Sequence, residues 1–432
     1  MKRRWCTPTA VCALLVALAV RSPAATVTWW HVWGEARNPL VEHMITNFEK
    51  ENPRTKVEHL VIPQAGMYEK YLQAIAGGSP PDVIMISRTM MPSFAEQGAL
   101  LPLDNLAARD NLVLEDIFYP GEVAISRFLG KTWALPGATA GGHSVLWWDK
   151  DLLDLGGLDS SKGPVTWREY RAFGKKLTVE TSDGRIRRLG ALPDGPGFPQ
   201  WLYTNGGRLL SDDGRRVACN SAEGVETLEW LQGWVNEIGG YNRITDWSST
   251  YVPGRPRYEK WWAGSLAMVI DGVWLFFQNS EQAPHVDYGV GLMPYNDTNS
   301  QAESANILDG TYGWSYAIPT GAKNTEGAWM WIKYITYGDG NRSFFTSQMR
   351  PSAARRVNQD PLFRKDNPYW GIVGQVLAGG IPVTLTPKSS QVLSILNSST
   401  ASAIQGKQAA RPALEDGARR AQAILDEWWS GQ

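Results

Sequence analysis

The chain carries short apolar runs that alternate with stretches of helical hydrophobic period. The run Val83–Ile86 is wholly apolar, as is typical of a buried parallel strand. Before it, residues 27–33 and 56–62 have strand composition, and residues 38–52 and 68–76 place apolar side chains on one helical face. Strand, helix, strand, helix, strand predicts right-handed crossovers and a layered α/β lobe.

The middle and the end of the chain also contain short apolar runs and stretches of helical hydrophobic period. Apolar strands are predicted at 145–148 and 267–270, and amphipathic helices at 167–177, 222–238 and 412–429. Two helix starts carry specific signals. Asn38 is predicted to cap the first helix with Pro39 at its first position, and Thr166 with Glu169 forms a capping box. Turn residues around 208–218 predict a hairpin.

The first residues have the order of a processing signal. Basic residues at 2–4 precede the apolar run Val11–Val20, which is too short to span a bilayer of ~30 Å, and Ser22–Ala25 supplies small residues. We therefore expect residues 1–24 to be a signal peptide, cleaved near residue 24 or 25; a short buried helix is the alternative. No cysteine follows the run at this site, so we expect a periplasmic protein without a lipid anchor.

Length and composition restrict the remaining possibilities. The chain has 432 residues, which favours two packed units. The formal net charge is −1 without a block of like charge, which argues against nucleic acid as a partner. Once the signal is removed, Cys219 is the last cysteine, so no intrachain disulfide is expected. The chain contains 21 tryptophans, and most of them must be core residues.

Catalytic and metal signals are weak. Gly130-Lys131-Thr132 lacks the first glycine of a phosphate-binding loop, because Ile125 stands in its place. The sequence has no Gly-x-Ser-x-Gly, His-Glu-x-x-His or Cys-x-x-Cys motif, and its five histidines are scattered. We therefore expect no enzyme activity, no metal and no cofactor.

Several short motifs occur together in one order along the chain. They are Pro81–Ile84, Gly98–Leu103, Trp133–Pro136, Leu146–Leu152, Asn205–Gly207, Asn220–Gly224, Gly264–Met268 with Gly272–Trp274, and Ala317–Pro319. In this order and spacing the chain resembles the extracellular solute-binding proteins of ABC sugar importers, the group that contains maltose-binding protein. The resemblance covers nearly the whole chain after the signal. It departs at Leu146–Lys150, where Tyr-Tyr-Asn-Lys is commoner in the family.

The resemblance implies an α/β, two-lobed periplasmic-binding-protein fold of type II, with an interlobe cleft and three hinge crossovers. The crossovers are expected near 137–144, 291–296 and 336–345. Residues 25–138 and 293–335 would then form the N-terminal lobe. Residues 139–292 and 336–432 would form the C-terminal lobe.

Candidate ligand-binding residues follow strand ends, where open α/β sheets bind ligands. Trp33 and Glu35 follow the first strand, Ser87 and Arg88 the third, and Asp271 and Trp274 the run 267–270. The resemblance places Trp274 where maltose-binding protein stacks its sugar. It also indicates His143, Trp201, Thr311, Tyr312 and Arg350.

Each candidate has a structural alternative. Core packing competes for the tryptophans, a surface ion pair for Arg88, loop orientation for Asp271 and a helix-end charge for Arg350. For His143 the alternative is a structural histidine, and at Thr311-Tyr312 the sequence departs from the family's glycine-rich pattern.

The resemblance implies a monomeric binding protein that captures a carbohydrate and delivers it to the two transmembrane permease subunits of an ABC importer. An aromatic plane can cover the C–H face of a sugar ring, while planar polar groups bind its hydroxyls. Two alternatives remain open. One is a binder of a polyamine or a phosphate ester on the same fold, and the other is an exported glycoside hydrolase.

Overall fold

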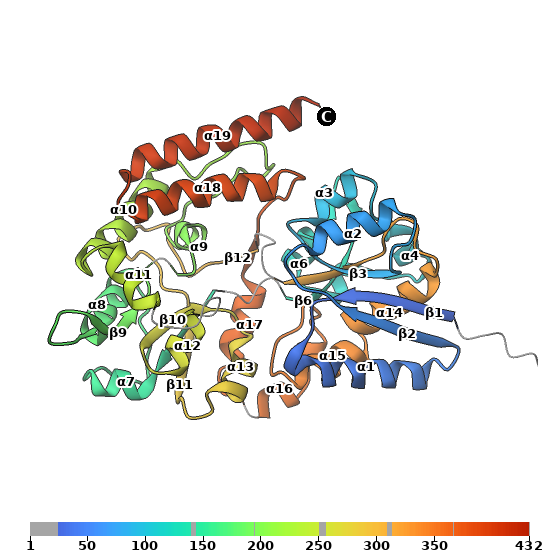
Figure 1. Cartoon of the computed structure of the whole chain (residues 1–432), viewed down its shortest axis with the longest axis horizontal. Coiled ribbons are helices and arrows are strands. Elements are labelled where there is room, and N and C mark those ends of the chain that lie inside the picture. Colours follow the sequence, from blue (N-terminus) through green and yellow to red (C-terminus); the bar gives the residue numbers. More distant parts are fainter. Residues whose placement is uncertain are drawn as a thin grey trace, which may run out of the picture.

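The protein has two α/β lobes, shown side by side in Figure 1. The computed structural model describes residues 25–139, 144–193, 195–249, 256–308, 313–365 and 367–431. Each lobe contains one five-stranded sheet, and helices cover the faces of both sheets. The expected two-lobed α/β fold is confirmed.

The sheet of the first lobe has the strand order β2-β1-β3-β13-β6. Its strands are β1 (Ala25–His31), β2 (Thr55–Val61), β3 (Val83–Ser87), β6 (Leu135–Ala138) and β13 (Trp314–Ala317). β1 pairs in parallel with β2 and β3, whereas β13 runs antiparallel to β3 and β6. A strand from late in the sequence thus completes the first sheet, so the chain returns to this lobe after building the second.

Helices pack around this sheet close to the predicted positions. The longer ones are α1 (Asn38–Glu51), α2 (Met67–Ala76), α14 (Thr325–Thr336) and α15 (Asp339–Thr346). Shorter helices are α3 (Met91–Glu96), α4 (Asp104–Arg109), α5 (Leu114–Ile117) and α6 (Pro120–Ala124), and β4 (Arg127–Phe128) pairs with β5 (Lys131–Thr132). The predicted cap at Asn38 is wrong. A 3-10 turn, η1 (Glu35–Arg37), runs into α1, so Arg37 is the N-cap and Asn38 is already helical.

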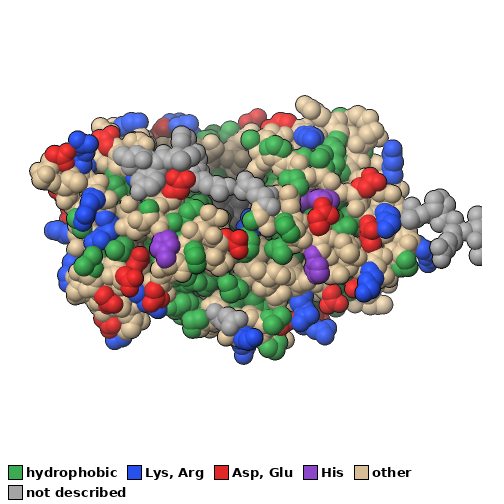
Figure 2. Space-filling view, turned by 60° about the horizontal axis from the view of Figure 1, so that its bottom comes forward, with side chains coloured by type: hydrophobic (Ala, Val, Ile, Leu, Met, Phe, Trp, Pro, Cys, Tyr) green, Lys and Arg blue, Asp and Glu red, His purple; other side chains and the backbone are tan. Residues whose placement is uncertain are grey.

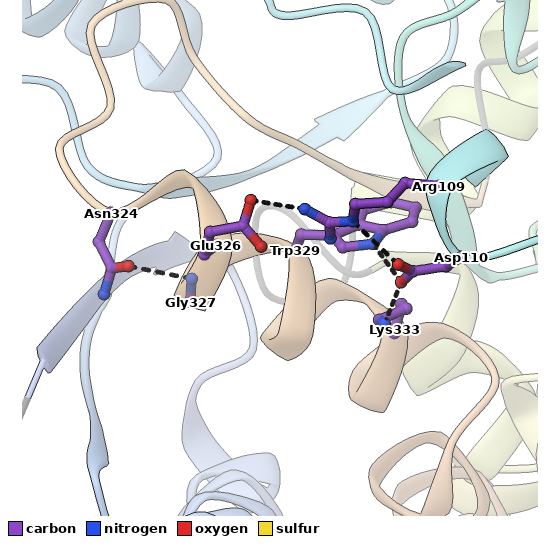
Figure 3. Close-up of polar contacts among 7 residues, drawn as sticks. All are labelled: Arg109, Asp110, Asn324, Glu326, Gly327, Trp329 and Lys333. Atoms are coloured by element: carbon purple, nitrogen blue, oxygen red, sulfur yellow. Dashed lines mark hydrogen bonds and ion pairs between the residues drawn. The ribbon is translucent and has the colours of Figure 1, made fainter. Parts of the chain in front are cut away.

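Polar contacts fasten α14 to α4 at the edge of the first lobe (Figure 3). The Asn324 side chain accepts a hydrogen bond from the Gly327 N–H and caps α14. Arg109 pairs with Glu326 at 2.6 Å. Asp110 accepts hydrogen bonds from Lys333 and from the Trp329 indole, and these hold the pKa of its carboxyl well below the usual range.

The sheet of the second lobe has the order β11-β7-β10-β9-β8. Its strands are β7 (Val145–Asp149), β8 (Val179–Glu180), β9 (Ile186–Ala191), β10 (Leu266–Asp271) and β11 (Tyr288–Leu292). β7 and β10 are buried along their whole length, as their apolar composition predicts.

The helices of the second lobe also follow the sequence pattern. They are α7 (Lys150–Leu155), α8 (Trp167–Leu177), α9 (Phe198–Tyr203), α10 (Ala222–Glu237), α11 (Tyr241–Ser249), α12 (Pro256–Trp262), α13 (Leu275–Gln282), α18 (Ser389–Ile404) and α19 (Ala410–Ser430). The Thr166–Glu169 capping box is present at the start of α8. The predicted hairpin at 208–218 is present in short form: the Ala218 N–H donates to the Leu209 carbonyl at 3.0 Å and the Ser211 N–H to the Arg216 carbonyl at 2.8 Å, around an antiparallel bridge between Leu210 and Val217.

The first passage between the lobes lies between β6 and β7, as expected, and includes residues outside the described ranges. The second differs from the expected 291–296. Tyr295 still bridges to Thr166 of the second lobe, and Asn296 bonds to Asn205 there. The chain then forms β12 (Asn306–Leu308), so it returns to the first lobe only between Leu308 and β13. Gly291 lies in β11 and Pro294 follows that strand, so these residues belong to the second lobe and do not mark this passage.

The third passage also differs from the expected 336–345. Helix α15 packs against α1 and α14 of the first lobe, and Ala354 bridges to Phe118. The chain reaches the second lobe through η2 (Val357–Gln359), α16 (Leu362–Lys365) and α17 (Trp370–Ala378), which packs against β11. β14 (Gly380–Pro382) then pairs in parallel with β12. Residues 336–354 therefore belong to the first lobe.

Candidate ligand-binding site between the lobes

Trp33 follows the carboxyl end of β1 and lies on the side of the first lobe that faces the second. Its indole N–H donates to the Tyr316 hydroxyl at 2.9 Å, and its backbone N–H donates to His31 Nδ1 at 3.0 Å. These contacts come from two strands of the same sheet, β13 and β1, so the indole is held at a fixed angle. Trp33 is 5% exposed, so it is buried in this arrangement of the lobes.

Trp274 supplies the matching aromatic side chain of the second lobe. It lies between β10 and α13, and its indole N–H donates to the Tyr258 hydroxyl at 3.1 Å. A Cβ atom on Gly272 would lie 2.1 Å from the Trp274 ring, so only glycine lets the indole fold back over the chain here. Asp271 is 2% exposed, and its Oδ1 accepts the Gly272 N–H at 2.7 Å, as expected of a residue that orients the loop.

Arg350 lies between these two tryptophans. Its Cζ atom is 5.6 Å from the centre of the Trp33 ring and 5.8 Å from that of Trp274, and the Phe345 ring is 5.9 Å away. The side chain is 4% exposed. One guanidinium therefore contacts aromatic faces from both lobes.

Arg37 is a second cation at the same edge. Its Cζ atom lies 5.6 Å from the Trp33 ring and 5.3 Å from the Phe277 ring of α13, and its Nε donates to Gln348 Oε1 at 3.0 Å. One buried apolar cluster likewise contains Trp33 of the first lobe and Val273 of the second. The lobes thus meet along these contacts. Figure 2 shows a hollow near the middle of the molecular surface.

The electrostatics of the site are positive. Burial, and next the charge of Arg37, lower the pKa of the Arg350 guanidinium to about 9. The group is nevertheless protonated at neutral pH, since a pKa of about 9 lies above it. The site therefore combines flat apolar surfaces with a buried positive charge.

Ser87 is the last residue of β3 and Arg88 follows it, and both side chains are buried. The Ser87 hydroxyl accepts a hydrogen bond from the Tyr68 hydroxyl at 2.7 Å. Arg88 is 0% exposed, pairs with Glu122 at 2.8 Å and donates to the Ala138 carbonyl at 3.2 Å. Arg88 is thus in an ion pair, although a buried one, and it supports the chain where the first passage between the lobes begins.

Trp201 is part of the core of the second lobe. It is 0% exposed on α9 and lies among Trp167, Tyr170 and Trp230, with ring centres 5.0 to 5.9 Å away. Trp329, Trp331 and Trp428 are buried and Trp429 is partly buried, which agrees with the expectation that most tryptophans are core residues. His143, Thr311, Tyr312 and the side chain of Glu35 lie outside the described residues.

The structure adds four residues that the sequence did not indicate: Arg37, Tyr258, Phe277 and Tyr316. Tyr258 and Tyr316 occupy equivalent roles, each accepting the indole N–H of the tryptophan in its own lobe. Arg37 lies four residues after Trp33, but nothing in the sequence pairs it with an aromatic ring 240 positions later. Within the described ranges, no three His, Cys, Asp or Glu residues are arranged to hold a metal, and no helix is long and apolar enough to cross a membrane.

Two α/β lobes joined by several passages are the architecture of a two-lobed binding protein, and the Arg350 guanidinium lies over aromatic rings of both lobes. A family model described as bacterial extracellular solute-binding protein matches residues 33–336. The chain belongs to this family, and its function is accordingly to bind a solute. The extracellular family agrees with the export signal expected at residues 1–24.

The chain is also similar to individual proteins. It is 24% identical over 440 residues to a putative binding protein of Brucella abortus, covering 98% of this chain and 99% of that protein. It is 24% identical over 319 residues to the sn-glycerol-3-phosphate-binding periplasmic protein of Shigella dysenteriae, covering 70% and 69% of the two chains.

Solved structures share the fold. A solute-binding protein from Thermotoga lettingae bound with α-D-tagatose has a TM-score of 0.76 at 21% identity, covering 93% of this chain and 100% of the other. The maltose/maltodextrin-binding domain from Bdellovibrio bacteriovorus bound to maltotriose has a TM-score of 0.75 at 20% identity, with coverages of 93% and 100%.

Proposed function

We propose that this protein is the periplasmic substrate-binding component of an ABC importer, and that it captures a carbohydrate between its lobes for delivery to the membrane permease. The observation that carries the proposal is the pair of tryptophans, Trp33 and Trp274, one from each lobe and both within 6 Å of Arg350. Aromatic planes cover the apolar face of a sugar ring, and planar polar groups bind its hydroxyls.

Closure of the lobes on the ligand is the proposed mechanism. A sugar that touches both tryptophans makes contacts in the closed form that the open form lacks, and this difference shifts the population toward closure. The permease then reads the closed shape. The structures bound to tagatose and to maltotriose support a carbohydrate as the ligand of this chain.

The alternatives differ in chemistry. The relative named as sn-glycerol-3-phosphate-binding supports a phosphate ester as the second candidate ligand. A polyamine is disfavoured, because Arg350 and Arg37 would repel a polycation at the junction. A glycoside hydrolase needs two carboxyl groups ~5–10 Å apart across the sugar, whereas the site described above is built from aromatic and cationic side chains.

A thermal-shift screen of mono- and oligosaccharides tests the proposal. A ligand at a hundredfold excess over its Kd stabilises the protein by about 2.7 kcal/mol, which raises the melting temperature measurably. The proposal requires at least one carbohydrate to do so while chromatography shows it unchanged after incubation. Stabilisation by no carbohydrate, or hydrolysis of the one that binds, would overturn it.

A further inference from the structure

The Arg350 guanidinium is buried, and among the described residues no carboxylate pairs with it. In the part of the chain that the structure describes, it forms no hydrogen bond and no ion pair, and its Nε is inaccessible to solvent and without a partner. Its contacts there are the faces of Trp33, Trp274 and Phe345. Buried charges in folded proteins are ordinarily paired and hydrogen-bonded, so this one is incomplete by itself.

The aromatic contacts compensate the charge only in part. The three ring centres lie 5.6 to 5.9 Å from Cζ, close to the ~6 Å limit of a cation–π interaction. Arg37 adds a positive charge on the same side and lowers the pKa of Arg350 further. The positive charges of Arg350 and Arg37 therefore favour an anion at this position. None of the described groups around Arg350 accepts a hydrogen bond from the N–H groups of its planar guanidinium.

We propose that Arg350 binds an acidic group of the ligand, a carboxylate or a phosphate, at the junction of the two lobes. This inference rests on the proposed function and names the chemical class of the solute: a sugar acid or a sugar phosphate. A guanidinium matches both groups because its N–H donors lie in one plane and can bind two oxygens at once. Placed between Trp33 and Trp274, it binds the acidic group while the indoles cover the ring.

The position of Arg350 links this recognition to closure. Met349 precedes it with a φ of 47°, and the Arg350 backbone N–H donates to the Phe345 carbonyl at 3.0 Å, so a tight turn after α15 directs the side chain. The turn belongs to the first lobe, whereas the Trp274 ring belongs to the second. Arg350 is buried against both lobes only when the lobes are together, so an anion bound to it offsets the cost of the buried charge only in that state. A neutral sugar does not offset this cost.

The test compares acidic and neutral forms of the same sugar by isothermal titration calorimetry. Trigalacturonate is titrated against its methyl ester, which keeps every hydroxyl and loses the charge. Glucose 6-phosphate is titrated against glucose, and sn-glycerol 3-phosphate against glycerol. We expect the acidic member of at least one pair to bind about 10- to 100-fold more tightly, as for hydrogen bonds to a charged group. The pair that responds distinguishes carboxylate from phosphate.

Variants connect the preference to this residue. Arg350→Gln is expected to remove the preference for the acidic member, so that the acidic and the neutral member of a pair bind the variant with affinities within about threefold of each other. The matched control is Arg54→Gln, which removes the same charge from an exposed position at the opposite end of the first sheet, ahead of β2. If Arg350→Gln does not fold, Arg350→Lys is used in its place. This variant keeps the positive charge but loses the planar set of N–H donors, and it is expected to reduce the preference for the acidic sugar.

The outcomes separate the two proposals. Equal binding of neutral and acidic sugars by the wild type overturns the anion site and leaves carbohydrate capture standing. Binding of sn-glycerol 3-phosphate alone, abolished by Arg350→Gln, supports the anion site and overturns carbohydrate as the ligand. A preference for acid that survives Arg350→Gln overturns the role of Arg350.

Discussion

Arg88 and Arg350 are both buried arginines of the first lobe, but their surroundings differ. Glu122 lies 2.8 Å from Arg88 and neutralises it beneath the passage to the second lobe. Around Arg350 the described contacts are aromatic rings, at the line where the lobes meet. A buried charge that is neutralised inside the protein supports structure, whereas one that is not neutralised is suited to a ligand.

The largest expected effect comes from breaking the paired site. Glu122→Gln keeps the size of the side chain but removes the charge opposite Arg88, leaving an uncompensated buried cation. We expect a loss of about 3–5 kcal/mol in the free energy of unfolding, measured by urea denaturation. The double variant with Arg88→Gln should recover part of the loss. A loss below about 1 kcal/mol would mean that the pair does not support the fold.

The second effect concerns the aromatic side of the ligand site. Trp274→Ala removes the indole next to Arg350 and is expected to weaken ligand binding by about 2 kcal/mol, or roughly thirtyfold, in a calorimetric titration. Trp274→Phe is the matched control, because it keeps a ring and loses only the bond to Tyr258. Equal affinity of the Ala variant and the wild type would exclude Trp274 from the site.

The third effect is a change in the free energy of unfolding that is expected to be small, and a small change would distinguish Arg350 from Arg88. Arg350→Met without ligand removes an uncompensated buried charge and keeps an apolar side chain. The free energy of unfolding should therefore stay within about 1 kcal/mol of the wild type or rise. Urea denaturation of the ligand-free protein measures it. A loss similar to that of Glu122→Gln would show that Arg350, like Arg88, is a structural residue.

The smallest effect comes from a partly exposed pair, Asp110 and Lys333, which gives the lower limit of the comparison. Lys333 and Trp329 hold the pKa of Asp110 below its usual ~3.9, so the folded protein keeps this charge at a lower pH than the unfolded chain. The stabilisation by this ion pair is fully present above the pKa that the Asp110 carboxyl has in the unfolded chain, and it is lost as the pH falls toward the lower pKa of the folded protein. Asp110→Asn should cost about 1 kcal/mol or less at pH 7.

The pH dependence of the same pair gives a sharper test than its size. The difference in melting temperature between Asp110→Asn and the wild type should shrink as the pH falls below about 4, because the carboxyl is then protonated in the unfolded wild-type chain while the folded protein still keeps it charged. A difference that stays constant between pH 7 and pH 3 would contradict the assigned cause of the shift.

Periodic apolar patterns predicted the elements well, because burial of one helix face or of a whole strand leaves a local signature. The strands 83–86, 145–148 and 267–270 and the helices α8 and α10 lie where the pattern places them. The passages between the lobes leave no such signature. Residues 291–296 have the composition of a hinge but contain the end of β11 and the bridge from Tyr295 to Thr166. Helix α15 has an ordinary helical pattern that does not indicate which lobe it joins.

The sequence predicted candidate site residues that lie near the junction of the lobes where these residues follow the end of a strand, as Trp33 and Trp274 do. Arg88 and Trp201 were predicted as ligand-binding residues from their residue type and position, but both side chains are buried in the interior of their lobes. The partners of Arg350 come from positions 33, 274 and 345, and contacts of this separation depend on how the lobes are placed. Only the structure brings them together.

The central claim is that a solute is captured between Trp33 and Trp274, and a titration of both tryptophans tests it most directly. The ligand found by the thermal-shift screen is titrated into wild type, Trp33→Ala, Trp274→Ala and the double variant. The account predicts that each single substitution weakens binding at least about tenfold, since closure needs both walls. Unchanged affinity in either single variant would contradict capture between the lobes.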